Sequence, residues 1–252
     1  MTFNLNGKKA FITGSTSGIG LYVAQKLEQY GCEVAINART IKSIDNVRNL
    51  FKKSVYGIAA DMTSEIESKK AIQEFLEKFQ ALDILVCNVG SGRSVSPLNE
   101  TIIDWKKSLD LNLFAAINPI SASINALEKS SGAVTCISSI CGEKIIDNAP
   151  LTYSVAKAAL NRYVVNASYY LAKKNIRINA VSPGNVMFPG SIWETKLKKN
   201  KEDVLNMIRN EVPLKNFISL EEISNAVVFL SSPLSNSTTG QIFSVDGGQS
   251  LS

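Results

Sequence analysis

A glycine-rich turn between an apolar strand and a helix is the feature that most restricts how this chain can fold. Residues 8–13 have the composition of a buried strand and run directly into Gly14-Ser15-Thr16-Ser17-Gly18-Ile19-Gly20. The helical pattern of residues 18–30 follows and ends at Gly31, a common residue just past a helix C-terminus. A strand, a glycine turn and a helix in this order predict the first unit of a parallel α/β sheet.

Each glycine of the turn has its own physical reason. Gly14 permits a tight turn, Gly18 has no Cβ to obstruct a pyrophosphate, and Gly20 lets the helix pack close to the strand. The helix N-terminus offers N–H groups and a partial positive charge, and Ser15, Thr16 and Ser17 can add hydroxyl donors. The spacing is GxxxGxG and not GxGxxG, so a plain turn without a ligand stays open as the alternative.

Short β-branched apolar segments alternate with longer helical patterns along the rest of the chain. Parallel strands need such crossover helices, and right-handed crossovers place them on both faces of the sheet. The sequence therefore predicts a single doubly wound Rossmann-type α/β domain over residues 1–252, with a parallel seven-stranded sheet. The predicted strands are residues 8–13, 32–37, 55–60, 82–88, 133–138, 176–181 and 241–245. The predicted helices are residues 18–30, 65–79, 101–127, 151–172 and 220–230. Pro119 should kink the third of them.

Residues 185–210 interrupt this alternation. Pro189 and Gly190 come before a polar amphipathic stretch that contains Trp193 and Ile208. A long insertion beyond the end of a strand is often a lid, so we expect a substrate lid at about residues 185–215. A surface helix without a role in catalysis is the alternative.

The chain contains no histidine. This excludes Ser-His-Asp and Cys-His catalysis and any His-ligated metal site, and we expect no metal. A proton-transferring side chain must therefore be Tyr, Lys, Asp, Glu or Cys. The four cysteines form no CxxC pair, and three of them lie in apolar segments, as buried reduced thiols do.

Charge and hydropathy limit the partners. No apolar run approaches the ~20 residues that span a bilayer, and residues 1–9 lack the apolar region of a signal peptide. We therefore expect a cytoplasmic protein without a membrane partner. The net charge of +5 is mild and unclustered, so no nucleic-acid partner is expected. The basic run at residues 196–201 is interpreted as a solvated helix face, with an anion-recruiting patch as the alternative.

Tyr153 and Lys157 are four residues apart on a predicted helix, so they share one face. A phenol has an ordinary pKa of about 10 and exchanges protons poorly near neutral pH. A neighbouring ammonium favours the phenolate, so Lys157 should lower the pKa of Tyr153. A hydroxyl of Ser138 or Ser139 could hold a substrate oxygen while Tyr153 exchanges its proton. The pattern YxxxK is common by chance, and two ordinary surface residues are the alternative.

Further motifs give the chain a resemblance to the short-chain dehydrogenase/reductase family over nearly its whole length. They occur in the family's order: TGSTSGIG at residues 13–20, Asp61, the Asn-x-Gly at residues 88–90, Asn112 in DLNLF, ISS at residues 137–139, YSVAK at residues 153–157, IRINAVSPG at residues 176–184 and VDGG at residues 245–248. The resemblance implies an enzyme that transfers a hydride between a nicotinamide cofactor and a carbonyl or secondary alcohol.

The resemblance also implies roles for individual positions. Tyr153 would be the general acid/base, Lys157 its pKa modulator and a ribose ligand, Ser139 the substrate-orienting serine, and Asn112 the residue that fixes a proton-relay water. Ser138 adjoins Ser139, and the spacing from Ser139 to Tyr153 is one residue longer than usual, so the serine assignment stays slightly open. The positions expected to bind the cofactor are Gly14, Ser15, Ser17, Gly18, Ile19, Gly20, Arg39, Asp61, Met62, Asn88, Gly90, Tyr153, Lys157, Pro183, Gly184 and Val186.

Two positions depart from the family pattern. Val89 occupies the middle of Asn-x-Gly, where a small residue is usual. Phe188 lies near the place of a threonine that commonly binds the cofactor. One cofactor ligand is therefore expected to be missing or replaced by Ser191.

The end of the second strand predicts NADP(H) as the cofactor. A site that prefers NAD places Asp or Glu there to bind the ribose 2′-OH, whereas this chain has Ala38 followed by Arg39. A guanidinium can bind a 2′-phosphate through two charge-assisted hydrogen bonds. A solvent-exposed arginine with loose cofactor specificity is the alternative.

The substrate is less closely defined. The polar loop after Gly90, with Arg93, and the lysine-rich stretch favour a polar or anionic carbonyl or alcohol, of the 3-oxoacyl thioester or sugar type. A non-catalytic cofactor-binding regulatory module is the alternative function. The resemblance also implies a homodimer or homotetramer that pairs the helices of residues 101–127 and 151–172. These helices carry the additional apolar positions Leu109, Leu113, Tyr163, Tyr169 and Tyr170, and packing of these residues inside one chain is the alternative.

Overall fold

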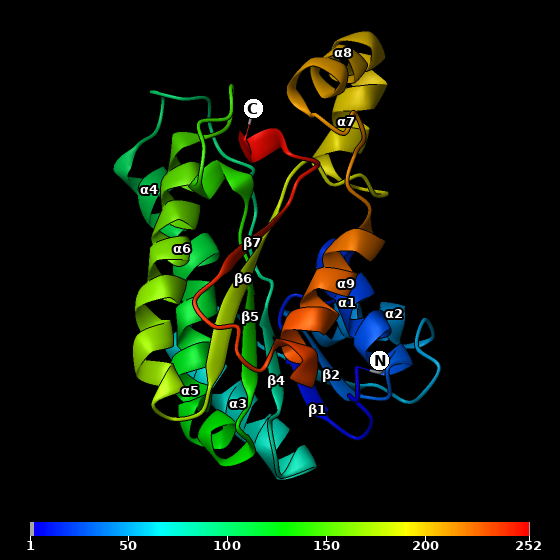
Figure 1. Cartoon of the computed structure of the whole chain (residues 1–252), viewed down its shortest axis with the longest axis vertical. Helices are drawn as coiled ribbons and strands as arrows, with labels where there is room; N and C mark the ends of the chain where they lie inside the picture. Colours follow the sequence, from blue (N-terminus) through cyan, green and yellow to red (C-terminus); the bar gives the residue numbers. More distant parts are fainter. Residues whose placement is uncertain (1–2, 252) are drawn as a thin grey trace.

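Seven parallel strands form one sheet in the order β3-β2-β1-β4-β5-β6-β7 (Figure 1). The computed structural model describes residues 3–251, so residues 1, 2 and 252 of the predicted domain lie outside the described part. Each predicted strand is present, with shifts of a few residues at its ends. The strands are β1 (Lys9–Ile12), β2 (Glu33–Ala38), β3 (Tyr56–Ala59), β4 (Ile84–Cys87), β5 (Ala133–Ile137), β6 (Arg177–Pro183) and β7 (Ile242–Val245).

Helices cover both faces of the sheet, as a doubly wound fold requires. On one face α1 packs against α9, and an apolar cluster with Ile12, Leu27 and Val227 fills the space beneath. On the other face α3 packs against α5 and α6 packs against β6, around a cluster with Phe11 and Phe75. The helices of the two faces are α1 (Gly18–Gln29), α2 (Ile41–Arg48), α3 (Glu65–Phe79), α4 (Ile102–Leu109), α5 (Ala115–Ser130), α6 (Leu151–Ala172) and α9 (Leu220–Ser231).

The long helix predicted over residues 101–127 is interrupted, but not where we expected. A π-helical segment, Asp110–Phe114, joins α4 to α5, whereas Pro119 lies inside α5. The ring of a proline crowds the carbonyl four residues earlier, here that of Ala115, which directly follows the wide turn. The irregularity therefore lies one turn before the proline.

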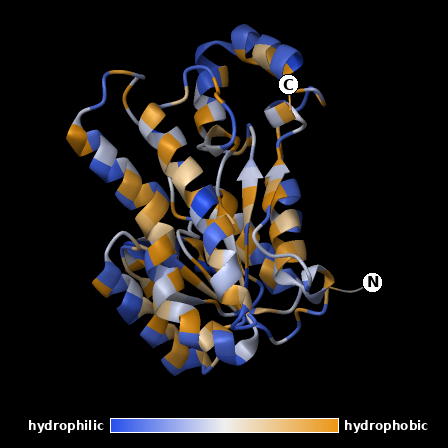
Figure 2. Ribbon diagram, turned by 60° about the vertical axis from the view of Figure 1, so that its left-hand side comes forward, coloured by the Kyte–Doolittle hydropathy of each residue, from blue (hydrophilic) through white to orange (hydrophobic). Residues whose placement is uncertain are grey.

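The stretch after β6 folds as a helical hairpin, α7 (Ile192–Lys199) and α8 (Lys201–Glu211). Ser191 and Asn200 cap the two helices through their side chains. The hairpin lies above the carboxyl ends of β6 and β7 in Figure 1, and it is mostly hydrophilic in Figure 2. Val204 and Ile208 are its buried positions. Among residues 3–251, no helix is long and apolar enough to cross a membrane.

Candidate active site

The site lies where the sheet's connections change direction. The chain proceeds from β1 through β2 to β3 on one side and returns to β4 on the other side of β1. Ligands of doubly wound sheets bind at such a switch point, beyond the carboxyl ends of the strands. A cleft of about 1330 Å³ occupies this position, and residues from the loops after β1, β2, β3, β4, β5 and β6 line it.

The glycine turn forms one wall of the cleft. Gly14 and Gly18 have φ of 58° and 53°, a left-handed conformation that favours glycine. A Cβ at Gly20 would lie 2.4 Å from Nδ2 of Asn88, so the close approach of α1 to the strands depends on this glycine. Ser17, the N-cap residue of α1, makes no capping hydrogen bond with its side chain and is exposed. The first N–H groups of α1 are therefore available to an anionic ligand.

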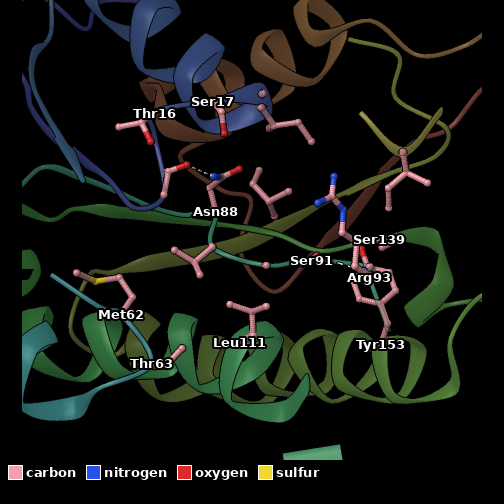
Figure 3. Close-up of a pocket in the computed structure, with 18 of the residues that line it drawn as sticks. Thr16, Ser17, Met62, Thr63, Asn88, Ser91, Arg93, Leu111, Ser139 and Tyr153 are labelled. Atoms are coloured by element: carbon pink, nitrogen blue, oxygen red, sulfur yellow. Dashed lines mark hydrogen bonds between the residues drawn. The ribbon is translucent and has the colours of Figure 1, made fainter. Parts of the chain in front are cut away.

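Asparagine side chains tie this turn to the neighbouring strands. Asn88 donates from Nδ2 to the carbonyls of Thr13 and Gly14, at 3.1 and 2.9 Å (Figure 3). The Oδ1 atom of Asn37 accepts the Gly14 N–H at 3.1 Å. Ser15 donates to the Ile12 carbonyl and is fully buried. Ser15 therefore fixes the turn from behind and does not line the cleft.

Ser139, Tyr153 and Lys157 meet at the other end of the cleft. Ser139 lies two residues after β5, and the two other residues lie on adjacent turns at the start of α6. Ser138 points elsewhere, because its hydroxyl donates to Asn161 Oδ1 at 2.5 Å. Figure 3 shows Ser139 directed toward Tyr153, so Ser139 is the serine that the structure brings to the tyrosine.

Burial controls the protonation of this pair. Desolvation raises the pKa of Tyr153 to about 12, and its hydrogen bond with Ser139 opposes that rise. Desolvation also lowers the pKa of Lys157 to about 8. The Lys157 ammonium lies 5.8 Å from the Tyr153 ring centroid and donates to the Ile137 carbonyl at 2.8 Å. The pKa of Tyr153 is therefore raised overall and not lowered, because burial of the phenol is the largest of the causes that shift it.

Asn112 is buried behind the cleft, within the π-helical segment. Its Oδ1 accepts the Ser91 N–H at 2.8 Å, and its Nδ2 donates to the carbonyls of Ser91 and Ser108. A Cβ at Gly90 would lie 2.9 Å from this Oδ1 and 3.1 Å from Nζ of Lys157. Gly90 therefore lets Asn112 and Lys157 approach the same point of the loop.

Most of the predicted site residues line this one cleft. They are Gly14, Ser17, Gly18, Ile19, Arg39, Asp61, Met62, Asn88, Gly90, Ser139, Tyr153, Lys157, Pro183, Gly184 and Val186. Ser15, Gly20 and Asn112 support it from outside. Sequence reasoning did not assign Asn37, Thr40, Ser43 and Thr63 to the site, although they also line the cleft. Thr16, expected as a hydroxyl donor of the turn, and Trp193, expected in the lid, line it as well. For Asn37, a polar residue inside an apolar strand was the available signal.

The two departures from the family pattern meet the glycine turn. A Cβ at Gly14 would lie 2.9 Å from Cγ2 of Val89, and one at Gly18 would lie 2.8 Å from the Phe188 ring. Ser191 lines the cleft, but its hydroxyl accepts the Glu194 N–H at 3.0 Å as the cap of α7. Its first function here is therefore to begin that helix.

Comparison with known families decides what kind of protein carries this site. The family described as enoyl-(acyl carrier protein) reductase matches residues 14–250. A 3-oxoacyl-[acyl-carrier-protein] reductase of Aquifex aeolicus is 31% identical over 98% of this chain and 99% of its own length. The chain belongs to the short-chain dehydrogenase/reductase family.

Solved structures of short-chain dehydrogenases agree with this assignment. L-sorbose reductase from Gluconobacter frateurii, in complex with NADPH and L-sorbose, has a TM-score of 0.91 at 27% identity, with 100% of both chains covered. A 7α-hydroxysteroid dehydrogenase in complex with NADH has a TM-score of 0.89 at 27% identity, covering 98% of this chain and 96% of its own. The protein is thus a short-chain dehydrogenase/reductase, an oxidoreductase of the hydride-transfer type.

Proposed function

We propose that this protein is an NADP(H)-dependent reductase or dehydrogenase of a polar carbonyl or secondary alcohol. The observation that carries the proposal is the convergence of Ser139, Tyr153 and Lys157 at one end of a cleft whose other end is the glycine turn. The absence of histidine leaves Tyr153 as the residue best placed to exchange a proton there.

The residues present fit a dinucleotide. Gly14, Gly18 and Gly20 form a cradle that a Cβ would fill, beside the uncapped end of α1. Asp61, Met62 and Asn88 would line the nucleoside portion, and Pro183, Gly184 and Val186 the nicotinamide portion. When bound, the cofactor supplies or accepts the hydride.

In the proposed mechanism the chain's own residues position the substrate oxygen and move a proton to it. Ser139 would donate a hydrogen bond to the substrate oxygen, and Tyr153 would exchange the proton at its Oη atom. Lys157, held by the Ile137 carbonyl, would place a positive charge that favours the phenolate, and it would bind the ribose. Asn112 would order a water that returns the proton from solvent.

The end of β2 supports NADP(H). Arg39 lines the cleft and is exposed, and Ala38 leaves no carboxylate to repel a 2′-phosphate. Thr40 and Ser43, whose hydroxyls lie 2.9 Å apart at the N-terminus of α2, add donors next to it. The carboxylate of Asp61 is engaged with Thr63, accepting its N–H at 2.9 Å and its hydroxyl at 2.8 Å.

A double substitution tests the cofactor. Ala38→Asp with Arg39→Ala should reduce the ratio of kcat/KM for NADPH to that for NADH by roughly 10- to 100-fold, since charged hydrogen bonds are lost and repulsion is gained. The ratio would be measured at saturating carbonyl substrate. Arg48→Ala, which removes an arginine outside the cleft, is the control. An unchanged preference for NADPH would contradict the assignment.

The substrate is proposed to be of the 3-oxoacyl thioester or sugar type. The names of the relatives support both classes, since one is a 3-oxoacyl reductase and another binds L-sorbose. The α7–α8 hairpin, with Trp193 on the cleft wall, is proposed as the substrate lid. We further propose that the chain assembles as a homodimer or homotetramer.

The direct test is NADPH oxidation with 3-oxoacyl thioesters, keto sugars and small diketones, with Tyr153→Phe as the control. Turnover that the control lacks supports the proposal and identifies the substrate class. Binding of NADPH without turnover across the panel would favour the non-catalytic module instead.

A further inference from the structure

The loop after β4 carries an arginine toward the catalytic end of the cleft. Arg93 is exposed and lines the cleft, and in Figure 3 its guanidinium points into the cavity. The proposed mechanism assigns this residue no role. An arginine so placed can select what binds next to the reacting carbon.

Contacts on both sides of Arg93 fix this position. A Cβ at Gly92 would lie 3.6 to 3.7 Å from Tyr153 ring carbons, so the loop lies directly against the phenol. On the other side, the hydroxyls of Ser94 and Thr152 lie 3.0 Å apart. Thr152 and Tyr153 are consecutive on α6, so the backbone of Arg93 is held over the first turn of that helix.

The base of the loop is held as well. The Asn112 side chain bonds both backbone groups of Ser91, and the Ser91 hydroxyl accepts the Arg93 N–H at 3.2 Å. An arginine on an ordered backbone loses less freedom when it binds a ligand than one on a loose loop. The loop therefore presents a partly prearranged cation.

The guanidinium has no carboxylate partner in the described part of the chain, where the ion pairs involve other residues. Positive charge also predominates on the cleft wall. The charged residues lining the cleft are Arg39, Arg93, Lys106, Lys107 and Lys157, against Asp61 and Asp110. Asp61 already accepts two hydrogen bonds from Thr63. An anion that enters the cleft would thus meet more positive than negative charge on its wall.

We propose that Arg93 binds an anionic group, a carboxylate or a phosphate, that the substrate carries close to its carbonyl. This rests on the proposed function, since it assumes that Tyr153 acts at that carbonyl. The planar guanidinium suits either anion, because both can accept two parallel hydrogen bonds. Arg93 is then the specificity residue of the site.

Paired substrates with and without the charge test the proposal. Acetoacetate is compared with methyl acetoacetate for a carboxylate, and dihydroxyacetone phosphate with dihydroxyacetone for a phosphate. In at least one pair, the wild-type protein should favour the anion in kcat/KM. Arg93→Gln should reduce that anion-to-neutral ratio by roughly 10- to 100-fold, and Arg93→Lys should restore part of it. The pair that responds identifies the anion.

Two controls separate the possible failures. Lys107→Gln removes the same charge from the α4 wall of the cleft and should leave the ratio unchanged; an equal loss in this variant would show a general field effect and overturn the proposal. A ratio that Arg93→Gln does not alter, with turnover that still requires Tyr153, would overturn the role of Arg93 but not the proposed function. A larger dissociation constant for NADPH in Arg93→Gln, with an unaltered anion-to-neutral ratio of kcat/KM, would assign Arg93 to the cofactor instead. If the wild-type protein shows no turnover that depends on Tyr153, the role of Arg93 and the proposed function are both overturned.

Discussion

At the scale of single residues, the site contains a tyrosine and a lysine whose charged forms are disfavoured by burial. Tyr153 has its pKa raised to about 12 and Lys157 has its pKa lowered to about 8, so each is shifted toward its neutral form. Neutral groups are easier to bury, but a proton-exchanging pair needs access to its charged forms. At neutral pH only Lys157 costs stability, because the phenol of Tyr153 is uncharged in both the folded and the unfolded chain.

Removal of the phenol hydroxyl should abolish turnover without loss of structure. Tyr153→Phe preserves the ring that packs against Gly92, so the temperature of unfolding should change little. Loss of the proton donor should lower kcat by roughly 10²- to 10⁴-fold. Steady-state kinetics at saturating NADPH would measure this loss, and near-wild-type turnover would contradict the role of Tyr153.

The lysine should affect stability in a pH-dependent way. Burial lowers its pKa from 10.5 to about 8, so the unfolded chain binds the proton more tightly than the folded one. The free-energy cost of burying the charged lysine is complete below pH 8 and disappears as the pH rises toward 10.5. The Lys157→Met variant should therefore be inactive and yet more stable at pH 7, with a free energy of unfolding raised by roughly 1–3 kcal/mol. This figure is the cost removed with the charge, less the hydrogen bond to the Ile137 carbonyl that the variant loses.

Urea unfolding at pH 7 and near pH 10 would measure that gain. It should shrink at the higher pH, where both proteins hold an uncharged side chain. A variant that is less stable than the wild type at pH 7 would contradict the argument.

Sequence reasoning identified the pair but not its electrostatics. The spacing of Tyr153 and Lys157 fixes their common face, whatever the rest of the chain does. The extent of their burial depends on the loop at residues 90–92 and on the end of β5, which no local pattern reveals. The anchoring of Arg93 depends likewise on Thr152, far away in the sequence.

At the scale of elements, the turn after β5 depends on one glycine. A Cβ at Gly142 would lie 2.7 to 2.9 Å from backbone atoms of Lys157 and Ala158, so this turn packs directly on the catalytic part of α6. Backbone cannot move aside as a flexible side chain can. The position of Lys157 is therefore coupled to the absence of a side chain at residue 142.

Gly142→Ala should therefore destabilise the protein and reduce activity. We expect a loss of about 1–3 kcal/mol in the free energy of unfolding and a fall in kcat as Tyr153 and Lys157 shift. Gly92→Ala is the matched control, because its Cβ would make ordinary contacts of 3.6 Å or more with the Tyr153 ring. Thermal unfolding and kinetics of both variants would check this; equal behaviour would refute it.

Long elements were easier to predict than short ones. The boundaries of α3 and α6, helices of fifteen and twenty-two residues, agree with the prediction. Helix α2 was missed and α7 was not resolved as an element, since each has only eight residues. The π-helical segment was missed because its wider turn has no distinct sequence pattern.

At the scale of the whole molecule, the outer face of α6 remains apolar. Tyr169 and Tyr170 are 64% and 67% exposed, whereas Leu113 and Tyr163 pack against the core of their own chain. Leu109 is half-buried. Among the five positions named for the oligomer, the two tyrosines are thus the exposed ones. An exposed aromatic pair of this kind favours association.

Sedimentation would test the assembly. The wild type should sediment as a dimer or tetramer of the 27.3 kDa chain. Tyr169→Glu with Tyr170→Glu should shift it toward the monomer, because two charges cannot be buried unpaired. Ile66→Glu, at a 69% exposed position on α3, is the control and should leave the sedimentation of the protein unchanged. A wild-type protein that sediments only as a monomer would contradict the prediction.

The packing of α1 against α9 has a consequence for how the protein is made. These helices form one layer, and Lys26 of the first pairs with Glu221 of the second at 2.9 Å. The ribosome adds roughly 5–20 residues per second, so α1 waits on the order of ten seconds or more for its partner. Throughout that interval the nascent chain exposes the apolar side of the helix that begins the glycine turn. Translation must therefore be nearly complete before the nucleotide cradle has its full support, and chaperones have that time to act.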